Sequence, residues 1–119
     1  MPTVGFTKIC DDLGCEIVCF TDDDVWVPET WVASLMRWFD KPEVAGVGGP
    51  NFAPPDKSTF WQRVIDVTFC SKWVTAGTNY GKRGSADLEP AEQLPGVNAA
   101  YRKSVLDEVG GFDDGAIGC

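Results

Sequence analysis

The sequence has no histidine and few basic side chains, and both shortages narrow the functions open to it. Lysine and arginine number 10 against 18 aspartates and glutamates, which gives a net charge of -8. Nonspecific nucleic-acid binding needs basic side chains that displace counterions from phosphates, so we expect no nucleic-acid partner. Without histidine or a second cysteine pair at the right spacing, we expect no zinc site at Cys15 and Cys19.

Long apolar runs and a regular cysteine framework are also missing. No run approaches the roughly 18 apolar residues of a membrane-spanning helix, so no span is expected in this stretch. The five cysteines are odd in number and include no C-x-x-C pair, and no signal peptide follows Met1. We therefore expect reduced thiols in a cytosolic setting.

What the sequence does contain is typical of one globular domain. The hydrophobic share is 44% and there are five tryptophans, which favours a packed protein over a disordered one. A chain of 119 residues can bury a modest core.

Apolar periodicity predicts alternating helices and strands. A short continuous apolar run indicates a buried strand, and aromatic residues at helical spacing indicate a helix. The predicted helices cover residues 3–12, 28–39 and 60–74, with a last one from Ser104, as its N-cap, to a stop at Gly110 and Gly111. The predicted strands cover residues 16–21, 44–48 and 97–101, and loops cover 48–58 and 75–93. This order predicts an α/β fold with a parallel sheet.

The stretch EIVCFTDDDVW places three consecutive aspartates directly after an apolar run. In an extended segment side chains alternate, so Asp22 and Asp24 lean to one side and Asp23 to the other. Two carboxylates about 5 to 7 Å apart repel by about 2 to 3 kcal/mol at an effective dielectric near 20. A hard divalent cation such as Mg²⁺ or Mn²⁺ would turn this repulsion into attraction.

The place of the aspartates in the chain bears on their role. Ligands of open α/β sheets bind outside the carboxyl ends of strands, and the aspartates follow the predicted strand 16–21 at such an end. A solvated acidic turn leading into a helix is the competing interpretation. From these residues alone, both interpretations stay open.

Three segments together resemble family 2 glycosyltransferases, which are inverting enzymes with a nucleotide-diphospho-sugar-binding GT-A fold. In order, the segments are EIVCFTDDDVWVPETWVASLMRWF, VAGVGGP and LPGVNAAYRKSVLDEVGGFDD. They cover nearly the whole chain from Glu16 onward. The resemblance implies a partial GT-A domain over residues 1–119, with a Rossmann-like parallel or mixed sheet and flanking helices.

The resemblance also implies roles for the residues that match the family's motifs. Asp22, Asp23 and Asp24 correspond to its D-x-D element. Asp24 would bind the Mn²⁺ or Mg²⁺ that bridges the donor's diphosphate, Asp22 would face the ribose or share the metal, and Asp23 would assist on the nucleotide side. In PGVNAAYR, Gly96 would allow close backbone approach, and Asn98 would offer amide hydrogen bonds or stabilise a turn.

Two further matches are expected to be structural. Arg102 would form a salt bridge with an acidic neighbour, with a phosphate as the alternative partner. Residues 110–113 would cap and position a helix near the site, without chemistry of their own.

Two parts of the family's pattern are missing from the sequence. Family members begin with a strand and loop that bind the nucleotide base, well upstream of D-x-D, and their general base follows the GGFDD segment. The general base would then fall beyond Cys119, so the catalytic residue is unknown and neither Asp113 nor Asp114 is assigned to this role. The resemblance therefore implies the central piece of an enzyme, truncated at both ends and inactive alone.

The implied partners are a nucleotide-sugar donor, with a uridine-diphosphate sugar as first choice, and a saccharide or lipid-linked acceptor. The expected location is cytoplasmic, and attachment of the whole protein to the cytoplasmic face of a membrane stays open. The alternative function is a non-catalytic acidic module that binds divalent cations or a partner protein. As a calcium loop, DDDVWVPETW lacks the mid-loop glycine of an EF-hand.

Overall fold

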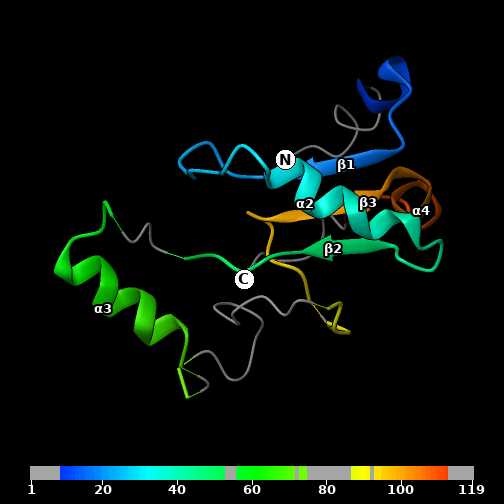
Figure 1. Ribbon diagram of the computed structural model, residues 1–119. Helices are drawn as coiled ribbons and strands as arrows, with labels where there is room; N and C mark the ends of the chain where they lie inside the picture. Colours follow the sequence, from blue (N-terminus) through cyan, green and yellow to red (C-terminus); the bar gives the residue numbers. More distant parts are fainter. Residues whose placement is uncertain (1–8, 53–55, 72, 75–86, 92, 113–119) are drawn as a thin grey trace.

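The computed structural model describes residues 9–52, 56–71, 73–74, 87–91 and 93–112, and confirms the predicted α/β class. A helical segment at 9–13 precedes the first strand. The elements that follow are β1 (Ile17–Phe20), α2 (Trp31–Met36), the 3-10 helix η1 (Arg37–Asp40), β2 (Gly46–Gly48), α3 (Phe60–Phe69), β3 (Ala99–Arg102) and α4 (Lys103–Glu108) (Figure 1). Residues 3–8 of the first predicted helix and most of the predicted loop 75–93 lie outside the described residues.

The three strands form one sheet in the order β1-β3-β2 (Figure 1). β3 pairs antiparallel with both neighbours, which differs from the parallel pairing that the alternation of helices and strands suggested. β1 and β2 do run in the same direction, connected by α2 and η1 as in a parallel crossover. The difference arises because β3 lies between them and runs the opposite way.

Each face of the sheet has its own small core. Successive side chains of a strand point to opposite faces, so Ile17 and Cys19 contact one core while Val18 and Phe20 contact the other. The first core is covered by α2 and η1, and its buried members are Leu35, Phe39, Val47 and Ala100. The second is covered by α4 and the helical segment 9–13, and its buried members are Cys10, Val18 and Leu106.

The helices begin and end at slightly different residues from those predicted. α2 begins at Trp31, because the Trp31 N–H closes a turn on the Pro28 carbonyl at 2.9 Å and leaves Pro28 outside the helix. α4 begins at Lys103 with Arg102 as its N-cap, so the prediction of Ser104 as N-cap is wrong. The predicted stop at Gly110 and Gly111 is confirmed: both have positive φ, +80° and +84°, and Gly111 donates its N–H to the Leu106 carbonyl at 2.8 Å.

The helix α3 ends at Phe69, earlier than the predicted Val74, and none of its residues is buried. Its start is stabilised locally by a capping box: Thr59 Oγ1 accepts from the Gln62 N–H at 3.3 Å, and Gln62 Oε1 accepts from the Thr59 N–H at 2.7 Å. In Figure 1, α3 (green) lies apart from the sheet. No helix among the described residues is long and apolar enough to cross a membrane.

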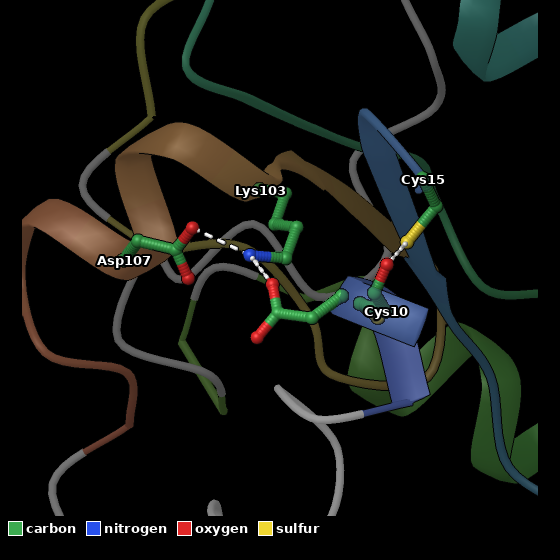
Figure 2. Close-up of polar contacts among 5 residues, drawn as sticks. Cys10, Cys15, Lys103 and Asp107 are labelled. Carbon is green, nitrogen blue, oxygen red and sulfur yellow. Dashed lines mark hydrogen bonds and ion pairs between the residues drawn. The ribbon is translucent and has the colours of Figure 1, made fainter. Parts of the chain in front are cut away.

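Lys103 joins the helical segment 9–13 to α4. Its Nζ lies 2.6 Å from Asp11 Oδ1 and 2.6 Å from Asp107 Oδ2 (Figure 2). Hydrogen bonds to Asp107 and Asp11 raise the pKa of Lys103 above its ordinary value. Beside this bridge, Cys15 Sγ donates to the Cys10 carbonyl at 3.4 Å, and Cys10, Cys15, Cys19 and Cys70 are free thiols.

Candidate functional site

Three segments that are far apart in the sequence meet at one edge of the sheet. β1 ends at Phe20 and β2 ends at Gly48, and both of these residues pair with Ala99, the first residue of β3. The segment after β1 carries the three aspartates, and the segment before β3 carries Asn98. The carboxyl ends of β1 and β2 therefore lie at the same edge as the start of β3, where a ligand of an α/β sheet is expected to bind.

The aspartates form an open acidic turn at this edge. Asp22, Asp23 and Asp24 directly follow β1, and all three are exposed. None of them has a hydrogen bond or ion pair with another residue in the described part of the chain. Across the same residues, no group of three or more carboxylate or thiol side chains is placed to bind one metal ion.

The donor chemistry of this turn fits a divalent cation that is shared with a phosphate ligand. Carboxylate oxygens are hard donors, and Mg²⁺ is usually bound by one or two of them together with water and substrate phosphates. Asp22 and Asp24 could supply those two carboxylates. The turn does not fit a cation that takes all of its ligands from protein, because no three carboxylate or thiol side chains among the described residues are placed to hold one ion.

Asn98 is the common hydrogen-bonding partner of the segments around it. Its side-chain Oδ1 accepts from Trp31 Nε1 at 2.9 Å, and its Nδ2 donates to the Pro50 carbonyl at 3.0 Å. Its backbone carbonyl accepts from the Gly49 N–H at 3.0 Å, and its own N–H donates to the Pro95 carbonyl at 3.1 Å. Asn98 thereby connects α2, the loop after β2 and the start of β3.

Two glycines, one at the end of β2 and one directly after it, leave room for this arrangement. A Cβ at Gly49 would lie 2.6 Å from Asn98 Nδ2, and one at Gly48 would lie 3.0 Å from Leu94 Cδ2. A Cβ at Gly96, by contrast, would have no neighbouring atom within 4 Å. Close backbone approach inside the protein is thus observed at Gly49, while Gly96 faces open space.

A cavity of about 970 Å³ opens beside this edge. Its walls include Trp31 and Trp38 from the α2–η1 region, and Asn98 from the segment before β3. Residues 22–24 and Gly96 are not among its lining residues. Of the side chains predicted to form the site, the structure therefore brings only Asn98 to the cavity, and the aspartates lie exposed outside its walls.

Arg102 has a structural role, but its partners are carbonyls and not the acidic side chain that was expected. Its guanidinium donates to the carbonyls of Phe39 at 2.6 Å, Val44 at 2.8 Å and Lys41 at 3.0 Å. These bonds connect β3 to the end of η1 and to the chain entering β2.

Of residues 110–113, Phe112 packs edge-on against Phe20 with ring centroids 5.4 Å apart, and Asp113 lies outside the described residues.

Two residues of this region were missed in the sequence. Trp31 lies at helical spacing from Leu35, Trp38 and Phe39, and this pattern predicts a core residue but gives no sign of a hydrogen-bond donor. Asn51 follows Pro50, and its Nδ2 is buried without a hydrogen-bonding partner in the described chain. A buried donor without a partner is costly, so an amide there marks a place where a ligand oxygen could bind.

Comparisons with known proteins give one result. A family model described as glycosyl transferase family group 2 matches residues 17–118. Neither the curated proteins nor the solved structures contain a match. The matched span includes all three segments that meet at the sheet edge.

Proposed function

The chain belongs to glycosyl transferase family group 2, and on this basis we propose that it binds the nucleotide-diphosphate part of a sugar donor for transfer to an acceptor hydroxyl. The observation that carries this proposal is the meeting of the aspartate turn, the loop after β2 and the Asn98 segment at one sheet edge. A uridine-diphosphate sugar is the proposed donor, and a saccharide or lipid-linked hydroxyl the proposed acceptor. The cysteine usage favours the cytoplasm for this reaction.

The residues of the acidic turn have separate proposed roles. Asp24 binds Mn²⁺ or Mg²⁺, and Asp22 shares the cation or contacts the ribose. Asp23 contacts the nucleotide. A bound divalent cation would neutralise charge that develops on the departing diphosphate. Because the three carboxylates are exposed and have no described partner, a ligand can reach them without breaking an interaction inside the protein.

The segment before β3 supplies the other side of the site. Asn98 keeps unused hydrogen-bonding capacity, because an amide oxygen can accept two hydrogen bonds and an amide nitrogen can donate two. Gly96 faces open space, so a ligand can approach its backbone. We propose that the reaction inverts the configuration of the sugar. Inversion requires a carboxylate that takes the proton of the acceptor hydroxyl, and we assign no described residue to this role.

Titration calorimetry with Mn²⁺ and uridine diphosphate tests the proposal. We expect the nucleotide to bind only when Mn²⁺ is present. Asp24→Ala should weaken this binding by at least about tenfold, or 1.4 kcal/mol, because it removes a charged ligand of the cation. Asp12→Ala is the matched control: it removes an exposed carboxylate of the helical segment 9–13 and should leave the affinity unchanged.

Two other outcomes would overturn parts of the proposal. Nucleotide binding that is the same in the wild type and in Asp24→Ala would reject the role of Asp24. Binding of Mn²⁺ with no effect on nucleotide affinity would favour the non-catalytic cation-binding module.

A further inference from the structure

Trp31 directly follows residues 21–30, the segment that carries the three aspartates (the aspartate segment). One hydrogen bond connects Trp31 to Asn98, which lies in the segment before β3. Its Nε1 donates to Asn98 Oδ1 at 2.9 Å, across 67 positions of sequence. The indole is half-buried beside the core formed by Leu35, Phe39, Val47 and Ala100. An N–H in this partly desolvated place needs a partner, and the Asn98 amide supplies it.

The two ends of the aspartate segment are bound to two consecutive residues, Asn98 just before β3 and Ala99 at its start. At the near end, Phe20 pairs with Ala99 in the sheet. At the far end, Trp31 donates to Asn98. Residues 21–30 therefore form a loop whose two ends meet at positions 98 and 99, and the three aspartates lie within it.

Asn98 also binds the third segment of the site, the loop after β2. Its Oδ1 is occupied by Trp31, and this orients the amide so that Nδ2 faces the Pro50 carbonyl, to which it donates at 3.0 Å. Without the indole N–H, only the Pro50 carbonyl would hold the amide in this orientation, because a carbonyl oxygen repels the amide oxygen and accepts from the amide nitrogen. The indole N–H and the Pro50 carbonyl together determine how Asn98 presents its donor and acceptor.

We propose that Trp31 is a positioning residue of the ligand site, which acts through Asn98 to align the aspartate turn with the loop after β2. This inference rests on the proposed function, because the ligand it serves is the metal–nucleotide complex. Trp31 itself contacts neither the nucleotide nor the cation. Its effect on binding comes from the geometry of the three segments before the ligand arrives.

A comparison of two conservative tryptophan variants separates positioning from packing. Trp31→Phe keeps most of the apolar ring and removes the indole N–H. Trp38→Phe makes the same change at a half-buried tryptophan that packs against the same core, but whose indole has no hydrogen bond with a described residue. Thermal unfolding should shift to a similar extent in both variants, since they lose similar apolar contact.

Affinity for Mn²⁺ and uridine diphosphate, measured by calorimetry on the whole chain, should differ between the two variants. Trp31→Phe should bind about fivefold more weakly, the factor that corresponds to one hydrogen bond of about 1 kcal/mol, and Trp38→Phe should bind as the wild type does. Adding Trp31→Phe to Asn98→Ala should cause no further loss, because both changes remove the same interaction.

Each result has a definite meaning. Equal affinity in Trp31→Phe and wild type, or an equal loss in Trp38→Phe, would overturn the positioning role and leave the proposed function standing. A further loss in the double variant would also overturn it, because Trp31 would then act independently of Asn98. A wild-type chain that binds no nucleotide with Mn²⁺ would overturn both the proposed function and this inference.

Discussion

Asn98 illustrates, at the scale of one residue, how a side chain can connect several segments and still keep capacity for further hydrogen bonds. Each of its two side-chain polar atoms makes one hydrogen bond inside the protein, to Trp31 and to the Pro50 carbonyl. Each atom has capacity for one more. The site role and the turn-stabilising role that the sequence suggested for Asn98 are therefore compatible, because they use different lone pairs and different N–H groups.

Gly49 allows Asn98 to occupy this position, and its replacement gives a direct test. In Gly49→Ala, the new Cβ would lie 2.6 Å from Asn98 Nδ2, so the amide must leave one or both of its hydrogen bonds. We expect the free energy of unfolding to fall by about 1 to 3 kcal/mol, measured by urea denaturation. Gly96→Ala is the control, because its Cβ would meet no atom within 4 Å, and it should change stability by less than about 0.5 kcal/mol. Equal stability of the two variants would mean that the segments are not in close contact.

Two thiols and a phenol should make stability fall at alkaline pH. Burial raises the pKa of Cys10, of Cys19 and of Tyr101. The folded protein therefore keeps these protons at pH values where the unfolded chain has begun to lose them. Stability is then fully present below the ordinary thiol pKa of 9.0 and falls as the pH rises above it.

Urea unfolding at a series of pH values from neutral to alkaline measures this dependence. Cys19→Ala removes one of the groups and should make the fall smaller. Cys70→Ala changes an exposed thiol and should leave the slope as in the wild type. A wild-type stability that rises through the thiol range would contradict the assignment of these side chains to the two cores.

At the scale of the elements, Arg102 joins β3 to η1 and to the chain that enters β2. This side chain extends from the end of β3 to three carbonyls at the end of η1 and before β2. Carbonyls at the end of a helical turn lack partners within it, so a guanidinium with several donors in one plane suits this place. Because the α2–η1 crossover carries one of the two cores, its attachment to β3 matters for the whole sheet.

Arg102→Lys should weaken this attachment although it keeps the positive charge. A lysine ammonium cannot reproduce the fork of the guanidinium, and we expect a loss of about 2 kcal/mol in the free energy of unfolding. Arg37→Lys is a matched control on η1: this exposed arginine stacks on the Trp38 ring at 4.6 Å, and its replacement should cost less than about 0.5 kcal/mol. Chemical denaturation of both variants measures the difference, and equal losses would contradict the role of the carbonyl contacts.

The elements were predictable from the sequence, but their pairing was not. Apolar runs predicted strands over 16–21 and 44–48, and these ranges contain β1 and β2. A strand that is buried on both faces needs consecutive apolar residues, and such a run can be recognised locally in the sequence. The place of β3 between them depends on contacts with residues far away, which no local pattern encodes. Similarly, α2 begins at Trp31 because a turn closes on the Pro28 carbonyl, although proline itself is suited to a first helical position.

The candidate site was predictable to the same degree. The position of Asp22, Asp23 and Asp24 at the end of β1 followed from an acidic triplet after an apolar run. The bond between Trp31 and Asn98 did not follow, because it joins residues 67 positions apart and each has a local explanation of its own. Sequence patterns thus pointed to the segments of the candidate site, and the geometry that relates them required the structure.

The charge of the whole molecule acts against its folded state. The net charge is -8, with 18 acidic against 10 basic side chains. A compact chain brings these charges closer together than an unfolded chain does, so their net repulsion disfavours the folded state. The three adjacent aspartates after β1 are the densest part of this charge.

Salt should therefore stabilise the protein, and a divalent cation should do so beyond its ionic strength. Raising NaCl from about 10 mM to about 150 mM shortens the Debye length from about 30 Å to about 8 Å and screens the repulsion. We expect the midpoint of thermal unfolding, measured by circular dichroism, to rise by about 2 to 4 °C, equivalent to roughly 0.5 kcal/mol.

MnCl₂ at matched ionic strength should raise the unfolding midpoint further in the wild type and not in Asp24→Ala. Binding of the cation to the folded state adds to screening, and we expect this binding only where the three aspartates lie together. A midpoint that falls with NaCl would mean that the Lys103 ion pairs outweigh the repulsion, and an equal effect of the two salts would mean that the acidic turn binds no cation.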